Sequence, residues 1–261
     1  MTIHTLASSS SGNCTLVSQG ASHVLIDAGI SLKRIKEGLK NMDMTPDDLT
    51  AVLVTHEHSD HISGIKMLVK YHKIPIFASI GAQNSICAST PEVAPYLSGF
   101  KVGTAFELGE IAMNSFNTPH DATESVGFTL DAGGNMLAYA TDLGHISEEV
   151  FTAMCGADIV IIESNHDQQM LQNGPYPPSL KRRIASKQGH LSNSACGSFA
   201  VRLVDSGTRY IQLSHLSREN NTPKIAARTV SEALGKYGIS VGQDIELDVA
   251  SPYTAGRVYD L

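Results

Sequence analysis

The hexapeptide His56-Glu57-His58-Ser59-Asp60-His61 decides how the rest of this sequence is interpreted. It directly follows Ala51-Val52-Leu53-Val54-Thr55, an apolar run typical of a strand that is buried on both faces. The polar loop is therefore expected at the carboxyl end of a buried strand, which is where open α/β sheets place their sites. Several imidazoles and a carboxylate in one loop suit a borderline divalent metal such as zinc, and they also accommodate manganese or iron.

The order of these side chains predicts two metal ions. His56 and His58 can face one metal, while Asp60 and His61 face another. Two metals need more ligands than one hexapeptide holds, and later predicted strands end at three further candidates, which are His120, Asp142 and His215. A lone His or Asp after a strand is more often a turn or cap residue. The joint order of all seven side chains is what favours a dinuclear site.

Composition restricts the class of protein. The chain has 261 residues, of which 42% are hydrophobic and 17% charged, and this provides ample apolar material for a globular core. Its four cysteines form no C-x-x-C pair, so neither a disulfide framework nor a cysteine zinc cage is indicated. The first residues include no basic segment, and no apolar run approaches the roughly 18 residues needed to cross a bilayer. We therefore expect a cytoplasmic protein with reduced thiols and no membrane partner.

Short apolar or β-branched runs alternate with helical periodicity along the chain. Strands are predicted at 3–6, 14–18, 23–26, 51–55, 111–116, 126–130, 136–140, 158–162 and 210–213. Helices are predicted from 32 through 39, at 62–71, 180–187 and 194–204, and from 223 to 233 with Thr222 as the N-cap. No Pro/Gly/Ser-rich linker or fixed-period repeat interrupts this alternation, so a single domain of two similar β/α halves is predicted over residues 1–261.

On these motifs the chain resembles the metallo-β-lactamase-fold superfamily, from Val24-Leu25-Ile26-Asp27-Ala28-Gly29 through His215. The resemblance implies a fold of the α/β or α+β class, a four-layer αββα sandwich with a dinuclear site at one edge of its two sheets. In the family's pattern, the first metal would be held by His56, His58 and His120, and the second by Asp60, His61 and His215. Asp142 would bridge the two metals. Asp27 matches an aspartate that usually supports the His loop, as residues behind metal ligands do, with a strand-end turn residue as the alternative.

Three further segments and one turn narrow the resemblance. They are Ile162–Asp167, Gly189–Asn193, Leu213–Asn221 and the turn Ser8–Asn13, which together look like those of the WalJ/YycJ group of small bacterial nucleases. Glu163 and His190 are similar to the acid and histidine that tRNase Z and RNase J relatives use near the leaving group. Only 47 residues separate Asp142 from His190, so no β-CASP-type domain fits between them.

Hydrolysis of a phosphodiester needs groups beyond the metal ligands. Two cations can clamp a phosphate and activate water, but the leaving alkoxide still needs a proton or a positive field. His190 suits the role of proton donor, and Glu163 or His166 could orient its ring, although capping roles are open to each of them. The predicted catalytic set is Asp60, Glu163, His166 and His190.

A serine-rich turn offers groups that could bind the phosphate. The candidates are Ser9, Ser10, Ser11 and Asn13, whose hydroxyls and turn amides can form an anion-binding nest, together with Ser192. A plain serine-rich turn explains the first four residues equally well.

The charge of the chain is uneven. The net charge of −7 argues mildly against nucleic acid as a partner if it is evenly spread, because Lys and Arg drive the binding of polyanions. Residues 178–230, however, contain nine Lys and Arg against two acids. The stretch 181–187 lies beside His190, which predicts a basic track that leads to the metals, with a solvated helical face as the alternative.

The leading interpretation is a metal-dependent phosphodiesterase that hydrolyses nucleic acid with two zinc or manganese ions. The family resemblance implies 5′-to-3′ exonuclease action, with DNA favoured over RNA. A hydrolase of a small ester or thioester, similar to glyoxalase II or a lactonase, shares all seven ligands and is the alternative. A metal sensor or flavodiiron-like module is disfavoured because the flavodiiron pattern usually has Glu where His58 stands. A β-lactamase proper is disfavoured because His61 follows Asp60 and no cysteine occupies the expected second-site position.

Overall fold

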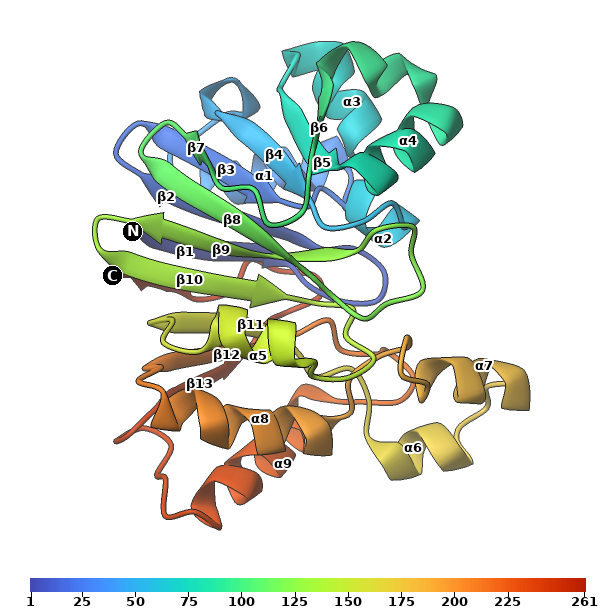
Figure 1. Ribbon diagram of the computed structural model, residues 1–261, viewed down its shortest axis with the longest axis vertical. Helices are drawn as coiled ribbons and strands as arrows, with labels where there is room; N and C mark the ends of the chain where they lie inside the picture. Colours follow the sequence, from blue (N-terminus) through green and yellow to red (C-terminus); the bar gives the residue numbers. More distant parts are fainter.

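Two mixed β-sheets face each other in the computed structural model, which describes residues 1–261 (Figure 1). The first sheet has seven strands in the order β14-β1-β2-β3-β4-β5-β6. Their bounds are β1 Thr2–Ala7, β2 Cys14–Gln19, β3 Ser22–Ile26, β4 Ala51–Val54, β5 Ile76–Ser79, β6 Leu97–Phe100 and β14 Val258–Asp260. The strands from β3 to β6 run parallel to one another, whereas β1 pairs antiparallel with β2 and β14.

The second sheet also has seven strands, in the order β13-β12-β11-β10-β9-β8-β7. Their bounds are β7 Phe106–Leu108, β8 Ile111–Asn117, β9 Val126–Ala132, β10 Asn135–Ala140, β11 Ile159–Glu163, β12 Tyr210–Ser214 and β13 Glu246–Val249. The strands from β10 to β13 are parallel to one another, and β7, β8 and β9 form an antiparallel meander. β9 pairs antiparallel with β10 and so connects the two parts of the sheet.

Helices cover the outer face of each sheet (Figure 1). The first sheet is covered by α1 Leu32–Lys40, α3 Ile65–His72 and α4 Ile80–Ser89, and the second by α5 Glu148–Met154, α8 Asn193–Asp205 and α9 Pro223–Gly235. The loops carry the short elements η1 Pro46–Asp48, α2 Ser59–Ile62, η2 Pro91–Tyr96, α6 Gln168–Asn173 and α7 Pro178–Ile184. None of these helices combines the length and the apolar character needed to cross a membrane.

Alternation along the strands produces three apolar layers. In β4, Val52 and Val54 point to the helices while Leu53 points to the other sheet. In β11, Val160 points to the helices while Ile161 points to the first sheet. The middle layer is a buried cluster of 20 residues from both sheets. The predicted αββα sandwich is therefore confirmed, and we infer from the shared middle layer that residues 1–261 form one domain.

Two predicted helices have different bounds in the structure. The helix expected at 62–71 is interrupted after Ile62, and α3 begins only at Ile65. Gly64 fills the interruption because a Cβ atom there would lie 2.3 Å from the carbonyl oxygen of Ile30. The helix expected at 180–187 runs instead from Pro178 to Ile184, since Pro is well suited to the first helical turn.

Strand ends bring the polar loops to one edge of the sandwich. Asp27 directly follows β3, Asp142 comes two residues after β10, and His215 directly follows β12. These three residues have positive φ values of 59°, 59° and 54°. Such a backbone conformation is unfavourable for a residue other than glycine, and it persists where the surrounding structure enforces it, commonly at functional sites.

Candidate active site

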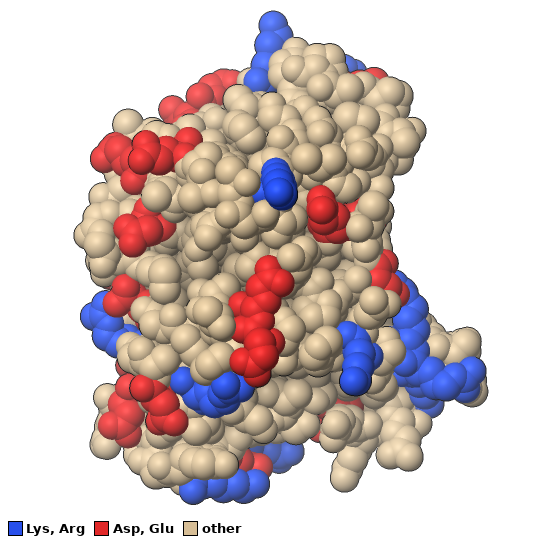
Figure 2. Space-filling view, in the orientation of Figure 1, with Lys and Arg blue, Asp and Glu red and all other residues tan.

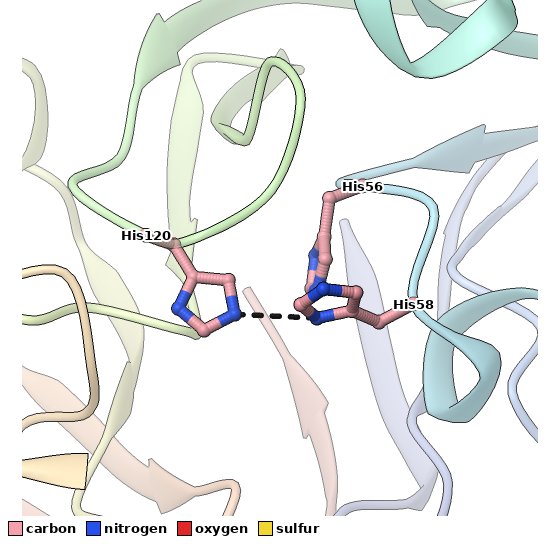
Figure 3. A group of neighbouring side chains, drawn as sticks. All are labelled: His56, His58 and His120. Atoms are coloured by element: carbon pink, nitrogen blue, oxygen red, sulfur yellow. Dashed lines mark hydrogen bonds between the residues drawn. The ribbon is translucent and has the colours of Figure 1, made fainter. Parts of the chain in front are cut away.

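Three histidines form one corner of the site (Figure 3). His56 and His58 come from the loop after β4, and His120 comes from the loop after β8. One nitrogen of each ring lies within 4.8 Å of a nitrogen of the other two. The Nε2 atom of His120 is 3.3 Å from Nδ1 of His58, and the buried Nε2 atom of His56 has no hydrogen-bond partner. This arrangement is suited to a shared cation.

A second group lies next to the first and consists of Asp60, His61 and His215. The Oδ2 atom of Asp60 is 3.4 Å from Nε2 of His61 and 3.3 Å from Nε2 of His215. The rings of His61 and His56 are stacked at a tilt with their centroids 4.1 Å apart, so the two groups are in contact.

Asp142 lies between the two groups. Its Oδ2 atom is 3.1 Å from Nε2 of His61, and its Oδ1 atom is 3.5 Å from Nε2 of His120. The side chain is buried, and Oδ2 makes no hydrogen bond. A buried carboxylate oxygen and a buried imidazole nitrogen without partners are costly unless a ligand satisfies them. The donor set therefore fits divalent cations of the kind that bind nitrogen and oxygen together.

Burial and neighbouring charges tune these groups in the metal-free chain. Burial and the nearby histidines hold the pKa of His56 well below its usual value, which keeps its ring neutral. Although burial works against its charged form, His61 has a pKa well above the usual value because Asp27 and Asp142 are negative. Burial likewise opposes the charge of Asp142, but the histidines around it hold its pKa well below the usual range. A cation at this site would replace the positive charge that these carboxylates stabilise on His61.

Asp27 orients two of the imidazoles. Its Oδ2 atom accepts a hydrogen bond from Nδ1 of His61 at 2.7 Å. The Thr55 hydroxyl donates to the same carboxylate at 3.0 Å and lies 3.1 Å from Nδ1 of His56, from which it can accept. Both rings thus carry their proton on Nδ1 and present Nε2 to the site. This is how carboxylates behind metal ligands fix a tautomer.

We expect Asp27→Asn to weaken metal binding by about 10- to 100-fold. The amide can place an N–H group against Nδ1 of His61, which favours the tautomer whose Nε2 atom carries a proton and cannot bind metal. Titration of the metal-free variant with zinc and manganese measures the effect. Asp131→Asn, an exposed aspartate on β9, is the matched control and should bind metal as the natural sequence does. Equal affinities in both variants would contradict the role of Asp27.

Glu163, the last residue of β11, supports the other side of the site. Its Oε1 atom accepts hydrogen bonds from Nδ1 of His190 at 2.8 Å and from Nδ1 of His215 at 2.7 Å. Its Oε2 atom accepts from the backbone N–H groups of Leu143 and Leu191 at 2.8 and 2.9 Å. Burial disfavours the charge, yet His190 and His215 lower the pKa of Glu163 to about 2. One buried carboxylate thus fixes three loops of the site.

His190 is held but not enclosed. Its Nδ1 atom donates to Glu163, and its side chain is 18% exposed to solvent. Burial lowers its pKa, but the charge of Glu163 outweighs this effect and raises the pKa above the usual value. Glu163, and not His166, is therefore the residue that orients His190. The structure leaves this imidazole a free edge that can face a substrate.

A cavity of about 380 Å³, which we call the metal cavity, opens over the metal-ligand groups. Its walls include the polar residues His58, Asp60, His120, Asp142, His190 and His215, together with Ser10, Asn165, Tyr176 and Arg183. Arg183 donates from Nη2 to Oδ1 of Asp121 at 3.0 Å, so one positive charge at the mouth is already paired.

Comparison with known proteins places this arrangement in a family. A family model described as a β-lactamase superfamily domain matches residues 22–215. The chain belongs to the β-lactamase superfamily. The match runs from β3 to His215 and thus contains every metal-ligand candidate.

Two curated members of the superfamily are similar over almost the whole chain. Exodeoxyribonuclease YycJ of Bacillus anthracis is 34% identical over 250 residues, which cover 95% of this chain and 94% of the relative. Exodeoxyribonuclease WalJ of Streptococcus pneumoniae is 34% identical over 258 residues, which cover 96% and 94%. Both names state an activity of those proteins.

Solved structures of the superfamily share the fold. Zn²⁺-bound PqqB from Methylobacterium extorquens superposes with a TM-score of 0.75 at 18% identity and covers the full length of both chains. The short form of human tRNase Z superposes with a TM-score of 0.67 at 14% identity, also over both full lengths. At these identities the likeness concerns the fold alone.

The serine-rich turn reaches the site through Asn13 and Ser10. Asn13 is fully buried, accepts the N–H of Ser9 at 3.2 Å, and points its amide at Nε2 of His61, also at 3.2 Å. The Ser9 hydroxyl accepts the N–H of Ser11 at 3.1 Å. Ser10 is the residue of this turn that lines the cavity. Ser192 lies elsewhere, as the N-cap of α8, and accepts from the N–H of Ala195.

Sequence reasoning missed a buried asparagine network beneath the site. The Asn221 amide donates to the carbonyl oxygens of Ser164 and Asn165 at 2.8 and 3.0 Å and to Oδ1 of Asn193 at 2.8 Å. Asn165 in turn donates to the carbonyl oxygen of His215 at 2.9 Å. The network joins the loops after β11 and β12 to the start of α8, so it helps to hold His215 in its strained conformation. The only signal in the sequence was the presence of asparagine in all four motif segments.

Proposed function

We propose that this protein is a metal-dependent exodeoxyribonuclease that hydrolyses phosphodiester bonds from the 5′ end of DNA. The observation that carries the proposal is the hydrogen bond between Glu163 and His190, because His190 lines the same cavity as five of the seven metal-ligand candidates. A donor poised beside a metal centre meets the need of an alkoxide leaving group. The two relatives at 34% identity, both named as exodeoxyribonucleases, support DNA as the substrate.

The ligand assignment follows the two groups of side chains. We assign one divalent cation to His56, His58 and His120, and a second to Asp60, His61 and His215, with Asp142 reaching both. Zinc and manganese both suit three nitrogen donors beside carboxylate oxygens. Such cations would supply positive charge to a bound phosphate and make a nearby water more acidic.

The residues of the chain divide the remaining work. Asp27 and Glu163 fix the imidazoles, so the site is organised before substrate arrives. His190 would donate a proton to the leaving 3′ oxygen, for which its raised pKa is favourable. Ser10, at the cavity wall, is the member of the serine turn placed to contact a phosphate, whereas Ser9, Ser11 and Asn13 shape the turn.

The deciding experiment incubates the metal-loaded protein with 5′- and 3′-labelled strands of DNA and RNA, both single and double. We expect a 5′ label to appear at once in the smallest product, while a 3′ label remains on a ladder of shortening strands. Early fragments of intermediate length from the 5′ label would instead indicate an endonuclease. The absence of any cleavage in zinc and in manganese would contradict the proposal.

Salt dependence separates this function from hydrolysis of a small ester. Basic side chains beside the site would displace counterions from DNA, so the logarithm of affinity should fall linearly with the logarithm of salt concentration. If Lys181, Arg182 and Arg183 each contact a phosphate, the slope for a single strand is about −2. Measurement of KM between low and moderate salt tests this expectation. A flat profile would favour a small, weakly charged substrate.

A further inference from the structure

A second cavity lies directly beyond His190. It has a volume of about 770 Å³ and is bounded by α6, α7, the start of α8 and the loop after Asp142. His190 lies at the boundary between the two cavities because it lines both of them, whereas Ile184 lines only the cavity over the metal ligands. Pockets for small organic ligands span roughly 300–1,000 Å³, so the space suits a molecule of the size of one nucleotide. We call it the basic cavity.

The basic cavity carries positive charge without a negative counterpart. Lys181, Arg182 and Arg202 line it, and none of its lining residues is Asp or Glu. Arg182 is exposed and forms neither an ion pair nor a side-chain hydrogen bond, whereas its neighbour Arg183 faces the metal cavity and pairs with Asp121. Figure 2 shows Lys and Arg atoms gathered on the right, where α7 projects in Figure 1. In a chain of net charge −7, such a collection indicates a site for an anion.

The inner surface of the cavity is apolar. Leu171 of α6 and Ala195 and Phe199 of α8 contribute carbon surface. The guanidinium group of Arg202 is held 3.5 Å above the ring of Phe151. Flat apolar surface beside fixed guanidinium groups is suited to a nucleobase next to a phosphate.

One buried polar atom in the wall has no partner in the protein. His166 is 3% exposed and lines the basic cavity, and its Nδ1 atom makes no hydrogen bond. Burial lowers the pKa of this histidine, so its ring is neutral. A neutral imidazole can both donate and accept a hydrogen bond, which matches the sugar or base of a nucleotide.

We propose that the basic cavity binds the 5′-terminal nucleotide of the substrate strand, with its 5′-phosphate against Arg182. The inference rests on the proposed function and deepens it. His190 would protonate the leaving 3′ oxygen, and in cleavage from the 5′ end that oxygen belongs to the terminal nucleotide. The terminal nucleotide must therefore lie on the His190 side of the scissile phosphate, where the basic cavity is. A space of about the size of one nucleotide there would favour the release of one nucleotide at each cleavage.

The test measures binding of thymidine 5′-monophosphate to the metal-loaded protein by calorimetry. Arg182→Glu should weaken binding by about 10- to 100-fold, the effect of losing a charged hydrogen bond. Lys36→Glu, an exposed and unpaired lysine on α1, makes the same change of charge far from the cavity and should leave binding unchanged. Thymidine and inorganic phosphate should each bind more weakly than the nucleotide. Because Arg182 is exposed, folding is not at risk, and Lys181→Glu provides a second variant.

The outcomes separate this inference from the proposed function. If inorganic phosphate binds as tightly as the nucleotide and Arg182→Glu changes neither, the nucleotide occupies the metals and the inference is wrong. The natural protein should have a lower KM for 5′-phosphorylated DNA than for DNA with a 5′ hydroxyl. Arg182→Glu should raise KM for the phosphorylated strands and remove this difference. If Arg182→Glu leaves the binding of thymidine 5′-monophosphate unchanged while the protein digests DNA, only the cavity assignment is overturned. Retention of nucleotide binding in a protein that cuts no DNA would reject the nuclease and leave the binding site.

Discussion

Asp142→Asn is expected to remove DNA hydrolysis, with a loss of about 10³-fold or more in kcat. Asp142 is the carboxylate that approaches both ligand groups, at 3.1 Å from His61 and 3.5 Å from His120. The asparagine side chain has the same shape but no negative charge, so it cannot hold two cations together. The variant should also retain less than the full complement of metal in elemental analysis after dialysis.

The control for this variant is Asp205→Asn, which removes an exposed carboxylate near the end of α8. It should keep both metal content and activity. Circular dichroism of the metal-free proteins should be alike for both variants, because asparagine fills the space of aspartate. Full activity of Asp142→Asn with its metal content intact would contradict the assignment of Asp142 as the residue that serves both cations.

The layers of the fold could be predicted where the residue pattern has one dominant cause. Strands such as β4 and β11 are continuous apolar runs because both of their faces are covered, and their positions were predicted within a residue or two. Residues 73–108 gave no prediction, yet they contain β5, α4, β6 and β7. The apolar residues of α4 do not gather on a single face, so it lacks the usual helical signal, and β5 and β6 are four residues long.

The metal-ligand candidates could be predicted because parallel strands end at one edge of a sheet. Asp142 and His215 meet for that reason, and His56 follows a strand of the first sheet that ends at the same edge of the sandwich. The groups that orient them could not all be predicted, since these contacts depend on loop geometry. Thr55 reads as the end of an apolar strand, yet its hydroxyl links Asp27 to His56.

The basic residues of α7 line two different cavities, which could not be predicted from the sequence. The sequence places Lys181, Arg182 and Arg183 side by side, which predicts one positively charged path to the metals. The orientation of α7 instead turns Arg183 to the metal cavity and the other two residues to the basic cavity. Consecutive helical residues point in directions about 100° apart, so this division follows once the helix is placed. His190 lies between the two cavities and lines both of them.

His190→Ala should lower kcat for DNA by about 10²- to 10⁴-fold, the usual contribution of a general acid. The loss should almost vanish with a p-nitrophenyl ester of thymidine 5′-monophosphate, because that leaving group departs without a proton. A residue that merely supports the fold would affect both substrates equally. The comparison therefore tests proton donation and not only participation.

Two further measurements complete the comparison. His72→Ala removes another histidine that is hydrogen-bonded to a carboxylate, Asp47, at 2.7 Å on the outer helix α3, and it should leave both activities unchanged. Metal content of His190→Ala should stay near that of the natural sequence, because the seven proposed ligands remain. Equal losses on both substrates together with lost metal would assign His190 to holding a cation, in line with its place beside Asp142, Glu163 and His215. Since Glu163 orients both His190 and His215, the dependence on the leaving group and the metal content are needed together to separate proton donation from metal binding.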